Sequence, residues 1–329
     1  MLKKPGKPGI ILVLALFGCG LITCDDSDHT VSIELYYPAK DKDPVLGVAT
    51  HIYFTTEKEI ITDLSNNSFL YRRHGEDTWR RSHVPVNGPH SIVYHPGQDL
   101  YYVNDTENHR MIAFRQLDQT GIMFEKNTIA GVELNRIHDV VHDHASGWIY
   151  ALDPYGPTVF RFKGLDEPAD KMTFPDQKGY ARALTLVDSR LFVILSEHGQ
   201  IIEIDDWEEN RYTVHQSYGH KRPAPAGSWV YTGLIPNDAE YFNGKWYVSS
   251  FFCQQYDPNS TTYVNRNNLI RFETWDDFES GNWEDLSDLI PAEDFIPYFL
   301  TVHNNRLFLS GFFSEPNENS QGGRIYVIR

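Results

Sequence analysis

The sequence predicts an all-β protein, and more narrowly a six-bladed β-propeller. An alternating apolar strand, a tight turn and an aromatic-rich second strand recur along the chain, at a period of roughly 40–60 residues. After residue 24 no segment keeps the 3.6-residue hydrophobic period of a helix. Aromatic residues make up 14% of the chain, which is too many for a disordered protein. Six repeats of four short strands are typical of a propeller in which each repeat forms one blade.

Each blade can be followed in order along the chain. A weak first copy of the two inner strands covers residues 50–54 and 59–62. Five clearer copies follow, at residues 90–94 with 100–103, 138–142 with 148–151, 182–186 with 191–194, 237–241 with 245–248, and 298–302 with 306–309. Third strands are predicted at residues 69–71, 111–114, 159–162, 201–204, 269–272 and 325–328. Tryptophans mark most outer strands, and we interpret residues 275–278 and 283–285 as solvated outer hairpins.

The last blade lacks a fourth strand of its own, because its third strand ends the chain at Arg329. Residues 30–37 form an alternating strand that no other blade uses. Placing this strand outside residues 325–328 closes the ring and covers an otherwise bare sheet edge. The sequence therefore predicts that the N-terminal strand completes the sixth blade.

One turn carries a family resemblance. Residues 101–114, with Asp105-Thr106-Glu107-Asn108-His109-Arg110 between two strands, resemble an NHL repeat. The resemblance implies a six-bladed propeller of the NHL/TolB-like group, which contains lactonases, lyases and binding modules. A fold shared by such different proteins does not select one function.

The first 24 residues are typical of an export signal. Lys3, Lys4 and Lys7 precede an apolar run over residues 10–22, which is short for a permanent membrane span. The residues before Cys19 and Cys24 resemble a bacterial lipobox, so lipid attachment is the alternative to simple cleavage. We expect a signal peptide at residues 1–24 and a single propeller domain at residues 25–329. We also expect a monomer that is secreted or periplasmic, with a lipid anchor as the alternative to a free protein.

Net charge excludes one class of partner. The chain has 45 acidic and 29 basic residues, which gives a formal charge of −16. Binding to nucleic acid needs clustered Lys and Arg that neutralise phosphates, so we expect no nucleic acid partner. Membrane contact is expected only through an N-terminal lipid.

The candidate site follows from propeller topology. Inner strands begin on the same face as the connections between blades and the loops between second and third strands. The residues expected there are Thr50 or His51, His90, His138, Arg182, Asn237 or Asp238, and Tyr298. Long connections at residues 218–236, 252–266 and 314–323 share this face, and the first contains His220 and Trp229. We expect a small molecule or a protein partner to bind here.

Two metal hypotheses stay open beside simple binding. His51, His90 and His138 would suit Zn²⁺, and this pattern is similar to the amidating lyases, whose zinc is held by blade-opening histidines. Residues 236–238 and 138–139 are similar to positions of the calcium-dependent lactonases and arylesterases, where oxygen ligands hold Ca²⁺. In either enzyme hypothesis Arg182 would hold an anionic substrate and Tyr298 would transfer a proton. His142 and His144 have metal-like spacing, but we assign them to a solvated turn on the opposite face.

Overall fold

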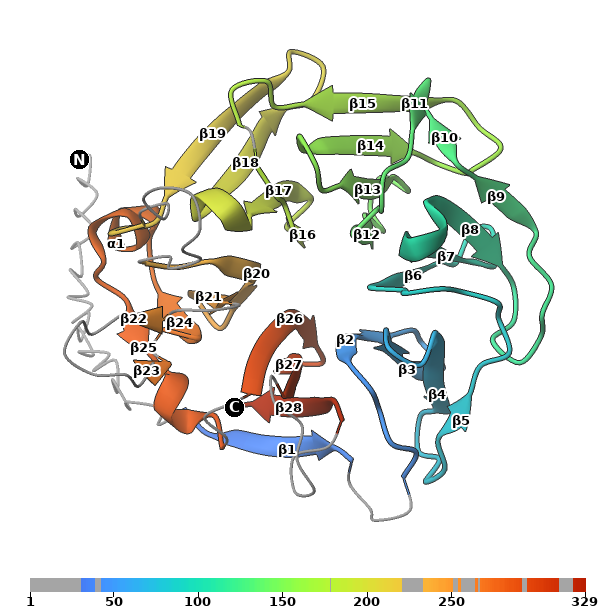
Figure 1. The fold of residues 1–329 in the computed structure, drawn as a ribbon, viewed down its shortest axis with the longest axis horizontal. Helices are drawn as coiled ribbons and strands as arrows, with labels where there is room; N and C mark the ends of the chain where they lie inside the picture. The colour runs from blue at the N-terminus through green and yellow to red at the C-terminus, as the bar shows by residue number, and fades with distance from the viewer. Residues whose placement is uncertain are drawn as a thin grey trace, which may run out of the picture. The chain divides into compact units, whose positions relative to one another are not determined.

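Six four-stranded antiparallel sheets are arranged as the blades of a ring, which confirms the predicted β-propeller (Figure 1). The structure is a computed structural model and describes residues 31–38, 43–177, 179–220, 233–250, 254–255, 264–265, 267–291, 295–313 and 322–329. Ser32–Arg329 form one compact unit, separate from Met1–Val31. Among the described residues no helix has the length and apolar character needed to cross a membrane.

The first three blades are formed by consecutive strands, and in each the first strand faces the centre of the ring (Figure 1). Blade one contains β2 (Ala49–Phe54), β3 (Lys58–Asp63), β4 (Ser68–Arg73) and β5 (Arg80–Arg81). Blade two contains β6 (Ile92–His95), β7 (Leu100–Asp105), β8 (Arg110–Phe114) and β9 (Phe124–Lys126). Blade three contains β12 (Asp139–His142), β13 (Ile149–Asp153), β14 (Thr158–Phe162) and β15 (Ala169–Thr173). The short hairpin of β10 (Thr128–Ile129) and β11 (Val132–Glu133) lies between blades two and three in the chain.

The remaining blades repeat this plan. Blade four contains β16 (Ala183–Val187), β17 (Arg190–Leu195), β18 (Gln200–Asp206) and β19 (Arg211–Gln216). Blade five contains β20 (Pro236–Phe242), β21 (Lys245–Ser250), β24 (Leu269–Phe272) and β25 (Glu284–Asp285), and β22 (Gln254–Gln255) pairs with β23 (Val264–Asn265) within it. Blade six contains β26 (Phe295–His303), β27 (Arg306–Phe313) and β28 (Arg324–Ile328).

The strand that closes blade six comes from the N-terminal side of the chain, as predicted. β1 (Ile33–Tyr37) pairs antiparallel with β28, with Ile33 opposite Ile328 and Tyr37 opposite Ile325. Tyr37 is almost fully buried in a cluster that joins blade six to blade one through Ile325, Ile52 and Trp79. The same strand therefore covers an open sheet edge and packs the junction where the ring closes.

A belt of side-chain hydrogen bonds joins every pair of neighbouring blades at the inner strands. These strands are the inner edges of their sheets, so some of their backbone groups have no partner within the blade. Side chains of a neighbouring blade supply partners for such groups at five junctions, and a bond between two side chains, Thr185 and Asp238, joins blades four and five. The bonds are Thr50 Oγ1 to the His90 carbonyl, Val140 N–H to Ser91 Oγ, Leu184 N–H to Asp139, Thr185 Oγ1 to Asp238, Leu300 N–H to Asp238, and Thr301 Oγ1 to the Ile52 carbonyl, all 2.7–3.0 Å long.

The NHL-like turn of blade two has a structural counterpart in blade four. The short helical turns Thr106–Asn108 and Ser196–His198 each end at a left-handed residue, His109 and Gly199 respectively. Thr106 Oγ1 donates to the Ile137 carbonyl, and Ser196 Oγ donates to the Pro236 carbonyl. Each turn thus ties its blade to the connection that enters the next one.

The interpretation of residues 275–278 as a solvated hairpin is wrong. Trp275–Ser280 form the helix α1, which begins at the N-cap Thr274 with a capping box to Asp277. Phe278 is fully buried and Trp275 packs against the same cluster. The helix was missed because six residues are too few to show a helical period.

Candidate functional site

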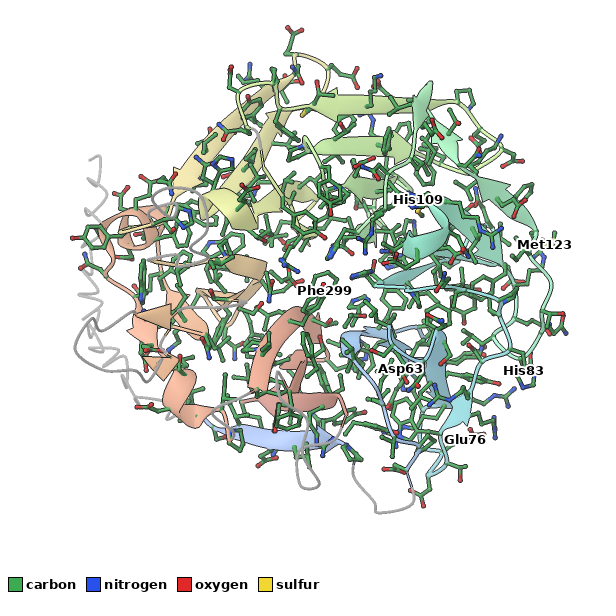
Figure 2. The ribbon with its side chains drawn as sticks, viewed as in Figure 1. Asp63, Glu76, His83, His109, Met123 and Phe299 are labelled. Atoms are coloured by element: carbon green, nitrogen blue, oxygen red, sulfur yellow. The ribbon has the colours of Figure 1, made fainter. Side chains whose placement is uncertain are left out.

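Four of the residues predicted to open inner strands meet near the centre of one face of the propeller: His90, His138, Arg182 and Tyr298. We call these four residues the polar cluster. The rings of His90 and His138 lie 4.1 Å apart, and the Tyr298 ring lies 6.3 Å and 6.2 Å from them, centroid to centroid. Phe299, which follows Tyr298, lies at the centre of the ring in Figure 2. Side chains separated by up to 208 residues in the sequence, 298 minus 90, are therefore brought into contact.

The hydrogen bonds of His138 define its tautomer. Its Nδ1 lies 2.6 Å from the Arg182 carbonyl oxygen, which can only accept, so Nδ1 carries the proton. Its Nε2 lies 3.1 Å from the Tyr298 hydroxyl. Burial, followed by the nearby His90 and Arg182, holds the pKa of His138 well below its usual range. A neutral ring with a proton on Nδ1 accepts at Nε2, so Tyr298 donates its hydroxyl proton to His138.

His90 keeps one ring nitrogen available. Its Nδ1 lies 3.1 Å from both the Gly88 carbonyl and Thr106 Oγ1. Thr106 already donates to the Ile137 carbonyl, so His90 Nδ1 is the donor in this group. Among the described residues Nε2 of His90 has no hydrogen-bond partner, and this atom is not fully buried. It therefore keeps a lone pair that a ligand could use.

The electrostatics of the cluster favour neutral histidines beside cationic arginines. Burial lowers the pKa of His90 to about 3, and Arg182 and Arg136 contribute in the same direction. Burial raises the pKa of Tyr298 to about 12, although the adjacent Arg182 acts against this rise. At neutral pH the cluster therefore combines uncharged His90, His138 and Tyr298 with the Arg182 guanidinium.

Tyr180 belongs to this site and was missed in the sequence. The Arg182 guanidinium lies over its ring at 5.1 Å, and the His138 ring meets it edge-on at 5.5 Å. Tyr155, which is half exposed, packs on its other side at 5.1 Å. Tyr180 comes three residues before the inner strand β16, so a search limited to the first position of each strand passes over it.

Asn237 and Asp238, predicted as ligand-binding residues, lie at the start of β20 and are engaged within the ring. Both carboxylate oxygens of Asp238 accept hydrogen bonds, from Thr185 and Ala239 on one side and from Leu300 on the other. Asn237 Nδ2 donates to the Pro297 carbonyl at 2.7 Å, while its buried Oδ1 has no partner among the described residues. The structure uses Asp238 to join blades, and only Asn237 keeps an available polar atom.

Of the three histidines predicted as metal ligands, His90 and His138 lie side by side, and His51 has other neighbours. His51 packs against Tyr53 and Phe299, with ring centroids 6.0 Å and 5.9 Å away. Both nitrogens of His138 are hydrogen-bonded, so this ring has no lone pair to give without breaking the bond to Tyr298. Across the described parts of the chain no three His, Cys, Asp or Glu side chains form a group that could hold a metal ion. Zinc binding by His51, His90 and His138 therefore stays a prediction, which this arrangement does not favour.

The calcium hypothesis meets a similar obstacle. Asp139 and Asp238 are the carboxylates at the corresponding strand starts, and both accept backbone N–H groups of the next blade. Burial raises the pKa of Asp139 to about 7 and that of Asp238 well above its usual range. The oxygens of these two carboxylates are engaged in hydrogen bonds between blades, whereas a hard cation requires oxygens that are free to coordinate it.

His220 lies at the end of the described part of its loop. Its Nδ1 lies 2.8 Å from the Leu234 carbonyl and its Nε2 lies 3.1 Å from the Glu197 carbonyl. This histidine therefore joins the loop to blade four. Trp229, the other ligand-binding residue predicted there, lies outside the described residues, as does most of residues 252–266 and 314–323.

His142 and His144 lie on the opposite face, in the hairpin between β12 and β13, as predicted. The assignment of both to a solvated turn is wrong for His142, which is buried with its Nδ1 3.1 Å from the Tyr94 carbonyl. His144 is exposed and packs edge-on against it.

Comparison with known proteins supports the fold. No protein-family model matches the chain, and no curated protein matches its sequence. Among solved structures, the chain is similar to a luciferin-regenerating enzyme, with a TM-score of 0.63 and 12% identity over 91% of this chain and 95% of the other. It is also similar to a streptogramin B lyase, with a TM-score of 0.58 and 12% identity over 91% and 97% of the two chains. A catalytically inactive variant of virginiamycin B lyase from Staphylococcus aureus, solved with quinupristin, gives a TM-score of 0.57 and 13% identity over 91% and 99%. At these identities the likeness shows a shared β-propeller fold.

Proposed function

We propose that the protein binds a small anionic ligand at the end of the ring that carries the polar cluster. The observation that supports this most directly is the convergence of Arg182 with neutral His90 and His138 in a buried setting. The Arg182 guanidinium is half-buried, so water screens its attraction to an anion less than at the open surface, and its planar donors match a carboxylate or phosphate. His90 Nε2 supplies an acceptor for a hydroxyl or amide of the same ligand.

Arg182→Gln tests this proposal. The variant removes the charge, so binding of small carboxylates and phosphate, measured by calorimetry on the purified protein, should weaken at least tenfold. Arg190→Gln is a matched control, because Arg190 lies in the same blade but forms an exposed ion pair with Glu203. Equal anion affinity in the wild type and Arg182→Gln would refute the proposal.

The hydrogen bond between Tyr298 and His138 favours a second function, acid–base catalysis of a lyase or esterase type. Because its raised pKa keeps Tyr298 protonated at neutral pH, the residue would act as a general acid that donates its hydroxyl proton to a leaving oxygen of the substrate. The phenolate left beside the Arg182 guanidinium would regain a proton from water. The similar lyase structures make quinupristin and simple lactones reasonable trial substrates.

Tyr298→Phe separates catalysis from binding. If Tyr298 transfers a proton, this variant should lose roughly 10²–10⁴-fold in kcat with little change in KM. Turnover that is unchanged in Tyr298→Phe would exclude this role. The proposal of anion binding would still be tested separately by Arg182→Gln.

We also propose membership of the NHL-type group and export from the cytoplasm. The matching turns at Thr106–Asn108 and Ser196–His198 support the first, and the basic head with its apolar run at residues 10–22 supports the second. Intact-mass measurement of the exported protein should find a start between Cys19 and Asp25. A retained Met1 would contradict export, and the added mass of a diacylglycerol would establish a lipid anchor.

A further inference from the structure

A cavity of about 520 Å³ lies among the hairpins that join first and second strands, on the face away from the polar cluster. Blades one, two, three and six all contribute to it. Its lining residues are Tyr53, Phe54, Thr55, Thr56, His74, Tyr94, Pro96, His144, His303 and Asn304. This volume is in the range of small-molecule sites. None of the lining residues is Asp, Glu, Lys or Arg, in a protein whose net charge is −16.

One wall of the cavity is a stack of rings. The rings of Phe54 and His303 lie 4.1 Å apart and are parallel within 3°. The His74 ring continues this orientation, 6.3 Å from His303 and within 4° of parallel. Phe308 packs against Phe54 at 4.8 Å. The stacked rings of Phe54 and His303 cover one another's faces, and this packing holds them in place along one wall of the cavity.

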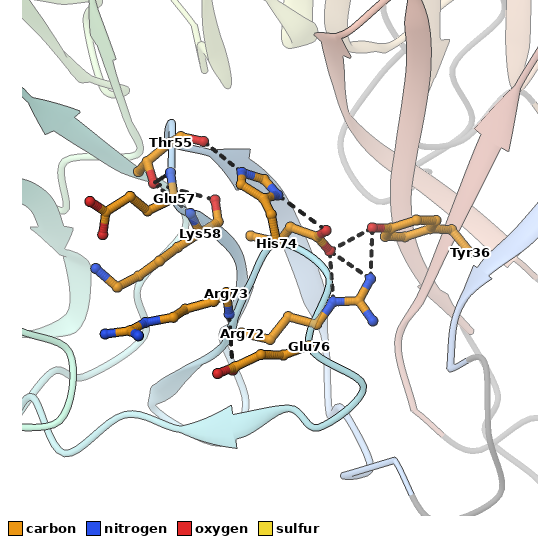
Figure 3. A network of polar contacts seen from close by, with 9 residues as sticks. Tyr36, Thr55, Glu57, Lys58, Arg72, Arg73, His74 and Glu76 are labelled. Atoms are coloured by element: carbon orange, nitrogen blue, oxygen red, sulfur yellow. Dashed lines mark hydrogen bonds and ion pairs between the residues drawn. The ribbon is translucent and has the colours of Figure 1, made fainter.

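Hydrogen bonds fix the outer end of this stack (Figure 3). His74 Nε2 lies 2.8 Å from the Thr55 carbonyl, and His74 Nδ1 lies 3.4 Å from Glu59. The other oxygen of the Glu59 carboxylate accepts from Tyr36 at 2.5 Å and from Arg72 at 2.8 Å. Because Glu59 is buried and its charge is paired, the stack rests on an ordered network that reaches the closing strand β1.

Four polar side chains that line the cavity have no hydrogen-bond partner among the described residues: Thr56, His144, His303 and Asn304. Burial lowers the pKa of His303, so its ring is neutral at pH 7 and can both donate and accept. Aromatic side chains combined with uncharged donors and acceptors suit a ligand with apolar ring faces and hydroxyl groups at its edge.

We propose that this cavity binds a neutral sugar of one or two rings, packed against the Phe54–His303 wall and hydrogen-bonded by Thr56, His144 and Asn304. The site is separate from the polar cluster and does not depend on the function proposed there. An anionic sugar is disfavoured, because the cavity offers no Lys or Arg to compensate its charge.

The test uses the mature protein on an array of neutral, sialylated and sulphated glycans, followed by calorimetry with the neutral sugar retained most strongly. Asn304→Gly removes a lining side chain and tolerates the left-handed backbone at that position, where φ is 47°. Asn305→Gly is the matched control, since Asn305 also has a positive φ but does not line the cavity. Asn304→Gly and His144→Ala should each weaken sugar binding about tenfold, and Asn305→Gly should leave it unchanged.

Three results would overturn the inference. They are no retention of any neutral glycan, retention of acidic glycans alone, and neutral-sugar binding that Asn304→Gly and His144→Ala leave intact. Melting temperatures of all variants within about 2 °C of the wild type would show that the changes in binding are local. Arg182→Gln, which alters only the polar cluster, should bind the sugar normally.

Discussion

Burial in the ring changes the protonation chemistry of single residues at the polar cluster. A free histidine titrates near 6.5, but His90 has a pKa of about 3 and His138 is also shifted well below the usual value. The first cause in both is the removal of water, and the second is a neighbouring positive or titratable group. These residues remain neutral through the physiological range, so the cluster offers lone pairs and one guanidinium instead of several cations.

His90 should make folding sensitive to acid. Its folded pKa lies below the unfolded value, so between pH 6.5 and about 3 the unfolded chain binds a proton that the folded chain does not. The contribution of neutral His90 to the free energy of unfolding is therefore fully present above pH 6.5, and it decreases as the pH falls from 6.5 to about 3. His90→Asn keeps a donor for the Gly88 carbonyl and removes the titrating group. Between pH 7 and pH 4 the free energy of unfolding of this variant should therefore fall by about 2–3 kcal/mol less than that of the wild type.

Urea unfolding of the two proteins at both pH values measures this difference. Both proteins contain the other titrating groups, so the difference between them isolates the contribution of His90. One of these groups is Asp139, whose raised pKa of about 7 makes stability increase as the pH falls. An equal loss of stability in both proteins would show that His90 is not the acid-sensitive group.

Asp238 should act on stability and not on ligand binding. Replacing it with alanine leaves the Leu300 N–H and the Thr185 hydroxyl without their partner in a buried position. Unsatisfied groups of this kind cost about 1–3 kcal/mol each. Asp238→Ala should therefore lower the melting temperature while anion affinity of the folded protein stays unchanged, which calorimetry below the transition would check.

At the level of elements, irregular strands determine where side chains point. The register shifts at the start of β2, β20 and β26, between Ala49 and His51, between Pro236 and Asp238, and between Pro297 and Leu300. A bulge interrupts the alternation of side chains and redirects them. This is why Tyr298 and Phe299, although consecutive, are both buried, and why a strict alternating pattern does not assign these positions.

The helix α1 gives a test of local capping. Thr274 accepts from the Asp277 N–H, and Asp277 in turn accepts from the Thr274 N–H. Thr274→Ala removes half of this capping box and should cost about 1 kcal/mol of unfolding free energy. Thr213→Ala is a control, because that exposed hydroxyl bonds only to Asp205 in the described structure. Chemical denaturation that finds equal stability for Thr274→Ala and the wild type would show that packing of Phe278 alone maintains the helix.

At the level of the whole molecule, closure by β1 couples the first blade to the last. β1 pairs with β28, Tyr37 packs at the junction, and Tyr36 bonds to Glu59 of blade one. Deleting residues 1–37 removes these interactions together and exposes the edge of β28. Burial of Tyr37 alone contributes about 2–3 kcal/mol, so the melting temperature of the entire domain should fall on the order of 10 °C.

Deleting residues 1–30 is the control, because it leaves β1 in place. Calorimetric scanning of both truncated proteins should show one transition each, with a lower midpoint only in the longer deletion. A longer deletion that melts like the control would mean that the ring is stable without its closing strand.

The sequence by itself determined the strands, the six repeats and the role of residues 33–37, because alternation of apolar residues and unpaired sheet edges are local properties that a linear pattern records. It also placed His90, His138, Arg182 and Tyr298 at one end of the ring, since topology puts equivalent strand starts on one face. The tertiary structure alone decided what those residues do. Whether Asp238 joins blades or faces a ligand, which nitrogen of His138 carries a proton, and that His303 stacks on Phe54 all depend on contacts between distant blades. Such contacts are set by the packing of one blade on the next, and no period in the sequence carries that information.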